Sequence, residues 1–215
     1  MFATTKVEGT DNVYIFRYQN HQAMFVVTPA GVIVTDPISY GRPQAAKTYL
    51  DEIRKITQGA DQIPDLQPPS LRSHRRRQSC SRMPAPPSIA HRRAKERLAA
   101  AQGPGRRHSR SRWWTASARS SSAARRLDLV FTGRNHSDSS LVLLLPKEKI
   151  LFAVDFNSLG AVPSRLAVND SYPTEWEASL EAHAGAWLGA HDPGPSWTGW
   201  AAWHQAKTWK SRLPS

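Results

Sequence analysis

The stretch LDLVFTGRNHSDSSLVLLLPKEKILFAVDF, from Leu127 to Phe156, carries the clearest structural pattern in this chain of 215 residues. It contains three runs with the length and apolar content of strands, namely Leu127–Thr132, Ser140–Leu145 and Lys149–Phe156. A short turn beginning at Pro146 joins the last two runs and predicts a hairpin. The polar loop GRNHSDSS, residues 133–140, separates the first two runs. We therefore expect three buried strands with one polar loop between them.

The N-terminal part of the chain shows a second ordered pattern. Short apolar runs at Val13–Phe16, Ala23–Thr28 and Val32–Asp36, separated by turn residues, predict an antiparallel meander. From Gly41 onwards apolar residues recur at helical spacing, at Ala45, Ala46, Tyr49, Leu50 and Ile53. A further amphipathic helix is expected from Pro173. The sequence thus predicts a mixed fold of sheets and helices.

The middle of the chain has a different composition. Of the 29 lysines and arginines, 16 lie between Arg72 and Arg126, together with one acidic residue, Glu96. The formal net charge of +12 therefore comes from this region, because the rest of the chain has 13 basic and 16 acidic residues. Arg, Ser, Pro and Ala dominate here, and only Ile89–Ala101 has the pattern of a folded element. We predict that this basic segment is disordered.

The order of these parts resembles the metallo-β-lactamase superfamily. A meander, a helix, a gap, a strand, the GRNHSDSS loop and a hairpin ending in Ala153-Val154-Asp155-Phe156 follow one another as in that family. The resemblance covers roughly residues 5–57 and 127–185. It implies an α+β fold, the four-layer αββα sandwich, which would here be incomplete and would carry the disordered basic segment. It also implies a metal site at one edge of the sandwich.

The resemblance assigns three residues to that site. It implies that His136 is a ligand of the first metal, that Asp155 bridges two metals, and that Asp36 is a structural carboxylate near them. The implied cofactor is a pair of zinc ions, and the implied activity is hydrolysis of a small-molecule ester, amide, thioester or phosphoester. Zinc held by imidazole and carboxylate with one open position turns bound water into hydroxide near neutral pH. An Asp at the bridging position favours the broad hydrolase branch over antibiotic resistance.

Two motifs that complete such a site are missing from the sequence. The family signature H-x-H-x-D-H should fall near residues 65–80 and does not occur there. A P-G-H motif should follow near the C-terminus, where the chain reads Pro193-Gly194-Pro195. Because two protein ligands cannot complete a zinc shell, we expect a hydrolase by descent that is inactive as written, and we assign no catalytic residue.

A frame-shift hypothesis accounts for both absences. Leu66–His74 can be encoded by CTA CAG CCA CCA TCA CTC CGA TCA CAT, which reads YSHHHSDHI from its second base. Ala190–Gly199 can be encoded so that the same offset gives HMIPGHPGPG. Both missing motifs therefore return at the expected positions. We interpret the gene as carrying compensating insertions and deletions, or its reading as containing sequencing errors.

This hypothesis sets the expected domain boundaries and leaves simpler interpretations open. Residues 1–59 and 127–187 would be the two halves of one domain, 60–126 a scrambled or disordered segment, and 188–215 a scrambled tail. His136 can also be an exposed loop histidine, and Asp155 can simply end a strand. Asp36 precedes Pro37, and an Asp before Pro is a common turn former.

The basic segment also suggests a second class of function. Arg106, Arg107, Arg110 and Arg112 precede Trp113 and Trp114, which suggests phosphate contacts with base stacking, in a non-catalytic protein whose basic segment binds nucleic acid. Frame-shifted coding also yields such residues, so we expect no specific nucleic-acid recognition. The lone Cys80, the lack of an apolar leader and the lack of a membrane-length apolar run predict a cytoplasmic protein without a membrane partner.

Overall fold

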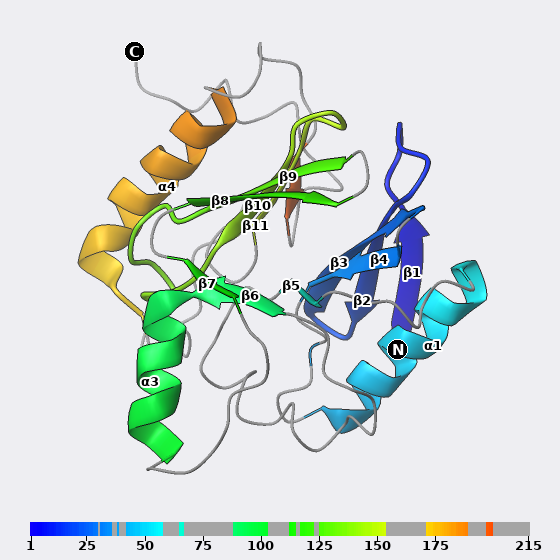
Figure 1. Cartoon of the computed structure of the whole chain (residues 1–215), viewed down its shortest axis with the longest axis horizontal. Coiled ribbons are helices and arrows are strands. Elements are labelled where there is room, and N and C mark those ends of the chain that lie inside the picture. The colour runs from blue at the N-terminus through cyan, green and yellow to red at the C-terminus, as the bar shows by residue number, and fades with distance from the viewer. Residues whose placement is uncertain are drawn as a thin grey trace. The chain divides into compact units, whose positions relative to one another are not determined.

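The computed structural model describes residues 1–29, 31–35, 38, 42–57, 65–66, 88–102, 112–114, 117–122, 125–153, 171–188 and 197–199 (Figure 1). The chain divides into two compact units. The first comprises Met1–Ala116 with Ser122–Arg125, and the second comprises Ser117–Ser121 with Arg126–Ser215. Each unit contains one sheet and at least one helix packed on it.

The first unit is built on a seven-stranded sheet whose strands follow in chain order. These strands are β1 (Phe2–Lys6), β2 (Val13–Tyr18), β3 (His21–Thr28), β4 (Gly31–Val34), β5 (Asp65–Leu66), β6 (Ser88–His91) and β7 (Arg112–Trp114). Strands β1 to β4 pair antiparallel, whereas β4 to β7 pair parallel. The predicted meander is confirmed as β2, β3 and β4. Strand β1 was not predicted, because FATTK has no apolar alternation.

Helix α1 (Pro43–Ile56) covers one face of the antiparallel strands. Pro43 opens the helix at a position where the missing N–H costs nothing, and the helix ends before Thr57, whose backbone is extended. Ala45, Tyr49 and Ile53 pack against a cluster from the strands that includes Phe16, Phe25, Val32 and Val34. The predicted helix is therefore confirmed, and its apolar spacing is the reason that it packs on the sheet.

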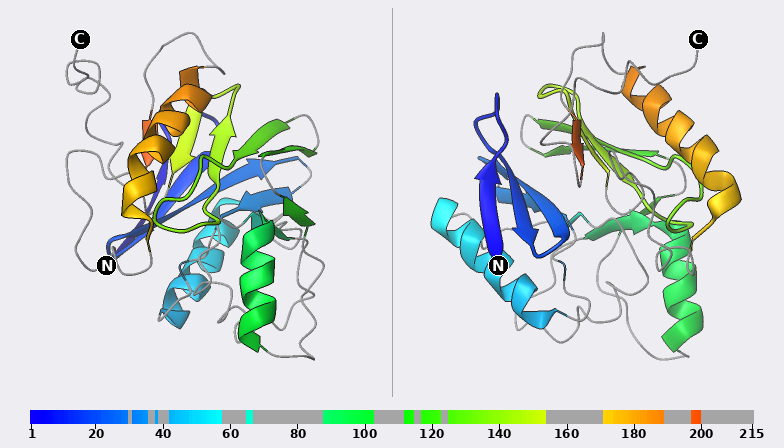
Figure 2. Two further views of the ribbon diagram at one scale, coloured as in Figure 1. Left: turned by 90° about the vertical axis from the view of Figure 1, so that its left-hand side faces the viewer. Right: turned by 180° about the vertical axis from the view of Figure 1, so that it is seen from behind.

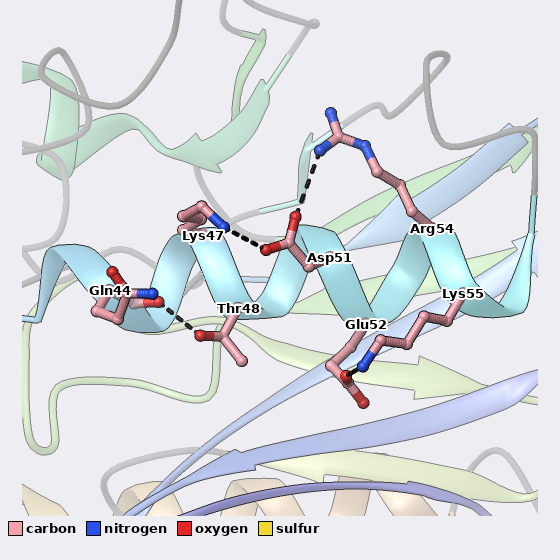
Figure 3. A network of polar contacts seen from close by, with 7 residues as sticks. All are labelled: Gln44, Lys47, Thr48, Asp51, Glu52, Arg54 and Lys55. Atoms are coloured by element: carbon pink, nitrogen blue, oxygen red, sulfur yellow. Dashed lines mark hydrogen bonds and ion pairs between the residues drawn. The ribbon is translucent and has the colours of Figure 1, made fainter.

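Ion pairs about one turn apart lie along α1 (Figure 3). Lys47 Nζ contacts Asp51 Oδ2 at 2.7 Å, and Lys55 pairs with Glu52. The hydrogen bond from Lys47 lowers the pKa of Asp51 below its usual value, and the hydrogen bond from Lys55 does the same for the pKa of Glu52. Glu52 Oε2 also accepts a hydrogen bond of 2.8 Å from Thr4 Oγ1, which ties edge strand β1 to the helix.

The basic segment contains ordered elements as well as undescribed stretches. Helix α3 (Arg92–Gln102) follows β6 directly and occupies the part of the segment that has a foldable pattern. Strands β5, β7 and β8 (Ser117–Ser122) also lie within residues 60–126, where we predict disorder. The rest of that segment and most of the predicted tail, 188–215, lie outside the described residues, so these boundaries remain predictions.

The second unit contains a five-stranded sheet in the order β12-β11-β10-β9-β8. Beyond β8, its strands are β9 (Arg125–Val130), β10 (Val142–Leu145), β11 (Ile150–Ala153) and β12 (Trp197–Gly199). The three predicted late strands are thus confirmed as β9, β10 and β11, which pair antiparallel. Every residue of β10 and β11 is buried, which explains their continuous apolar sequence.

Helix α4 (Pro173–Leu188) packs on this second sheet, as both views in Figure 2 show. Trp176 lies in a buried cluster with Val142, Leu144, Leu151 and Ala153, and Leu180 packs beside it. The spacing of Trp176 and Leu180 places both side chains on the same face of the helix. The predicted helix from Pro173 is confirmed. None of the described helices is long and apolar enough to cross a membrane.

Candidate functional site

The loop between β9 and β10 is the candidate site of the second unit. It carries His136, and its residues Asn135, Asp138, Ser139 and Ser140 are all buried. A polar loop that is buried needs partners for its polar groups, because each unpaired group costs free energy. Those partners come from within the loop and from the first turns of α4.

Asn135 makes several hydrogen bonds within the loop and to its surroundings, and it is fully buried. Its side-chain amide donates to Ser179 Oγ at 2.9 Å and to the Gly133 carbonyl at 3.3 Å. Its side-chain oxygen accepts from the Ser137 backbone N–H at 3.3 Å. Its own backbone N–H donates to the Ser137 carbonyl, and its carbonyl accepts from the Tyr172 N–H at 2.8 Å. Each polar group of Asn135 therefore has a partner.

Arg134 provides a second attachment between the loop and α4. Its guanidinium forms a two-point ion pair with Glu175, in which Nε lies 2.6 Å from Oε2. The same guanidinium lies over the ring of Tyr172, at 4.9 Å from the centroid. Both side chains of the ion pair are well exposed, so this contact contributes less to stability than the buried bonds of Asn135. Its two-point geometry nevertheless helps to fix the loop's direction.

The serines that follow His136 close the other side of the loop. Ser137 Oγ and Ser140 Oγ lie 2.7 Å apart, and the Ser139 N–H donates to Ser137 Oγ at 3.2 Å. Serine hydroxyls commonly form hydrogen bonds to backbone groups a few residues away, and in a loop these bonds take the place of the backbone hydrogen bonds between strands. The backbone on both sides of His136 is therefore held by hydrogen bonds.

The imidazole of His136 is carried by this hydrogen-bonded loop. Nδ1 is buried and has no hydrogen-bond partner among the described residues. The ring meets Trp176 edge to face, with centroids 6.3 Å apart. A buried nitrogen without a partner is uncommon in native proteins and calls for an explanation such as a bound ion. The nitrogen lone pair is the group that a metal ion would require.

The other two residues assigned by sequence cannot be compared with His136. Asp155 and Asp36 both lie outside the described residues. The expectation that Asp155 converges on His136 therefore remains a prediction, as does the place of Asp36 beside them. Within the described part of the chain, no group of three or more His, Cys, Asp or Glu residues is arranged to hold a metal ion. His136 alone does not fit a complete zinc shell.

His91, to which the sequence assigns no role, is a buried histidine of the first unit. It ends β6 and is 2% exposed, and its Nδ1 accepts a hydrogen bond of 3.3 Å from the Arg93 backbone N–H. Its Nδ1 therefore has a partner, in contrast to Nδ1 of His136. Sequence reasoning missed Ser179 and Trp176, because the only signal for them is their spacing of three residues on one helix face.

The chain has the metallo-β-lactamase fold, an α+β fold. Neither a protein-family model nor the sequence of a curated protein matches the chain. Solved structures do match it. The metallo-β-lactamase from Pontibacter korlensis is 17% identical, with a TM-score of 0.67, over 93% of this chain and 90% of that one.

Two further metallo-β-lactamases are similar to this chain. Metallo-β-lactamase IND-7 is 14% identical, with a TM-score of 0.66, over 88% of this chain and 87% of that one. The DIM-1 metallo-β-lactamase is 16% identical, with a TM-score of 0.60, over 88% of this chain and 86% of that one. At such identities the likeness establishes the fold, and function has to be argued from the site.

Proposed function

We propose that this chain descends from a binuclear zinc hydrolase and that its present sequence keeps only part of the metal site. The observation that carries the proposal is Nδ1 of His136, which is buried and has no hydrogen-bond partner among the described residues, on a hydrogen-bonded loop in a chain with the metallo-β-lactamase fold. An unpaired buried nitrogen is destabilising by about 1–3 kcal/mol, so its retention favours a role that needs a free lone pair.

Sheet topology supports Asp155 as the second ligand. Strands β9 and β11 both pair antiparallel with β10, so they run in the same direction. The C-terminal ends of β9 and β11 lie at the same end of the sheet, since Val130 pairs with Val142 and Phe152 pairs with the next residue, Leu143. The chain therefore leaves β9 toward His136 and leaves β11 toward Asp155 from one edge of the sheet. We expect both side chains, with Asp36 nearby, to converge there.

A zinc ion held at this edge would supply a hydroxide nucleophile near neutral pH. The substrate class that we propose is a small molecule with an ester, amide, thioester or phosphoester bond. A catalytic zinc ion normally has three protein ligands and a water, however, and His136 with Asp155 supplies two. We therefore propose that the chain as written hydrolyses such substrates only weakly. A cytoplasmic location is part of the same proposal.

The position of β5 supports the frame-shift hypothesis. Strand β5 pairs parallel with β4 through Val34 and Asp65, and it ends at Leu66, the first residue of the shifted window. The alternate reading YSHHHSDHI would thus begin where a parallel strand ends. Metal and catalytic ligands commonly follow the carboxyl ends of such strands. The missing H-x-H-x-D-H motif would then lie at the end of the sheet toward which β4 also runs.

Zinc content and DNA sequence together test the proposal. We expect the chain as written to hold fewer than two zinc ions, and a variant with both windows returned to the alternate frame to hold about two and to gain esterase or lactonase activity. His136→Ala in the restored variant should lower the zinc content, whereas His21→Ala should not. A folded, restored variant without zinc would contradict the metal site. Codons incompatible with the alternate reading would contradict the frame shift.

A further inference from the structure

We infer that Ser179 is a positioning residue, whose hydroxyl on α4 holds the loop that carries His136 and so fixes the orientation of an imidazole whose buried Nδ1 has no hydrogen-bond partner among the described residues. This role rests on the proposed function, since a metal ion is what His136 would bind. Its geometric part can be tested without any metal. No sequence pattern points to Ser179. It lies three residues from Trp176, on the same face of α4.

The hydroxyl of Ser179 connects two residues of the loop. It accepts a hydrogen bond of 2.9 Å from the Asn135 side-chain amide, and it lies 3.1 Å from Thr132 Oγ1. Ser179 is 1% exposed and Asn135 is fully buried, so water cannot replace either contact. One helix hydroxyl therefore holds the loop on both sides of Gly133.

The loop and the helix approach each other closely at Gly133 and Ser179. A Cβ atom placed on Gly133 would lie 3.8 Å from Ser179 Cβ, which is contact distance. Without the hydroxyl, the Asn135 amide keeps a single bond of 3.3 Å to the Gly133 carbonyl. The buried Thr132 hydroxyl would likewise lose its contact with Ser179 Oγ. Removing one oxygen atom therefore weakens the attachment of both loop residues.

The consequence reaches His136 through the backbone of its two neighbours. Its neighbours Asn135 and Ser137 bond to each other through two hydrogen bonds, so Asn135 sets the backbone on both sides of the ring. Trp176 borders the ring itself. Trp176 and Ser179 are three residues apart on α4, so the same helix face fixes the loop and borders the imidazole. Ser179 thus acts on His136 through Asn135.

The test compares the full chain with its Ser179→Ala and Glu177→Ala variants. Alanine is a better helix former than serine, so a loss in Ser179→Ala cannot come from a weaker α4. We expect the Ser137 and Tyr172 amides to exchange with solvent about ten times faster. The ring-proton shifts of His136, which depend on the nearby indole of Trp176, should move toward those of an unstructured histidine. Glu177→Ala, which changes an exposed residue, should alter neither readout.

Zinc titration separates the inference from the proposed function. Removal of a group that orients a metal ligand typically weakens metal binding 10- to 100-fold, and we expect such a loss in Ser179→Ala. If the unmodified chain binds no zinc while Ser179→Ala still changes exchange and ring shifts, the metal site fails and the positioning role stands. Unchanged exchange and ring shifts in Ser179→Ala would overturn the role, and so would equal zinc affinities in case the unmodified chain does bind zinc.

A second variant keeps the inference testable if Ser179→Ala does not fold. Valine has nearly the same shape as threonine, so Thr132→Val removes only the hydroxyl that faces Ser179. We expect a smaller change in the same direction, with amide exchange of Ser137 about three times faster, because the bond from Asn135 to Ser179 remains. Unchanged exchange and ring shifts in this variant would equally overturn the inference.

Discussion

The imidazole of His136 and the indole of Trp176 meet edge to face, at an angle of 72° between the ring planes. Trp176 is 8% exposed and also belongs to the core cluster between α4 and the second sheet. Such aromatic pairs contribute roughly 0.5–1.5 kcal/mol beyond the area that they bury. The same indole therefore packs in the core and borders the candidate ligand, so the loop cannot shift without disturbing the core.

This double role predicts a graded response to substitution of Trp176. Trp176→Ala removes a large buried side chain and should lower the free energy of unfolding by about 3–5 kcal/mol. Trp176→Phe keeps an aromatic edge and should cost less, roughly 1–3 kcal/mol, while it shifts the His136 ring signals. Urea unfolding measures both values, with exposed Glu181→Ala as the control. Equal stability of the alanine and phenylalanine variants would argue against the packing described here.

Substitution of Gly133 should destabilise the protein because of the backbone conformation at this position and not because of lack of space. Its φ of +109° is a conformation that residues with a side chain rarely adopt, yet an added Cβ would be no closer than 3.8 Å to its neighbours. Gly133→Ala should therefore destabilise the protein by about 1–3 kcal/mol. Gly9 has φ +73° in open space, and Gly9→Asn is the matched control, because asparagine tolerates that region. A Gly133→Ala variant as stable as Gly9→Asn would contradict this account.

Strands and helices with strong apolar periodicity could be predicted from sequence, and the reason is local. Tyr49 and Ile53 recur at helical spacing, and the buried runs of β10 and β11 leave little alternative to strands. Strand β1 lacks such a pattern, since its position depends on pairing with β2 and not on its own apolar residues. Strands β5, β7 and β8 are likewise fixed by pairing, so composition alone did not predict them.

The candidate site could be predicted only in part, for a related reason. The motif around His136 identifies the loop, because the residue types of a ligand loop are visible in the sequence. Its attachment to α4 is not visible, since Ser179 lies 44 residues from Asn135 in the chain. Polar contacts over such separations depend on the assembled fold. A single serine within a helix gives no sequence signal for them.

Two substitutions of Tyr49 separate the energetic contribution of its hydrogen bond from that of its packing in the core of the first unit. Its hydroxyl donates to the Met24 carbonyl at 2.8 Å, and that carbonyl also accepts from the Thr35 N–H at 2.9 Å. Tyr49→Phe therefore leaves no carbonyl unpaired and should cost only about 0.5–1.5 kcal/mol. Tyr49→Ala, which also removes the ring packed on Phe16 and Phe25, should cost about 3–5 kcal/mol. Denaturant unfolding of both variants measures the difference.

Glu52 predicts a pH dependence of stability whose sign follows from its contacts. The hydrogen bond from Lys55, and then that from Thr4, lowers its pKa below the value of 4.5, although burial opposes this shift. A carboxylate whose pKa is lower in the folded state stabilises that state above the unfolded pKa, and the stabilisation is lost as the pH falls through the folded pKa.

Glu52→Gln removes this titration and provides the test. At pH 7 the variant should lose about 0.2–1 kcal/mol of unfolding free energy, the range of a partly exposed ion pair. Between about pH 5 and pH 3 the unmodified chain should lose that same amount relative to the variant, so that their stabilities converge in acid. Thr4→Val should reproduce part of the effect, because it removes the weaker of the two bonds that lower the pKa. Asp51→Asn is the comparison on the same helix, since the Asp51 side chain is 41% exposed against 13% for Glu52, so that solvent screens its pairs with Lys47 and Arg54 more strongly. Parallel stability curves for Glu52→Gln and the unmodified chain across this range would show that Glu52 does not link β1 to α1.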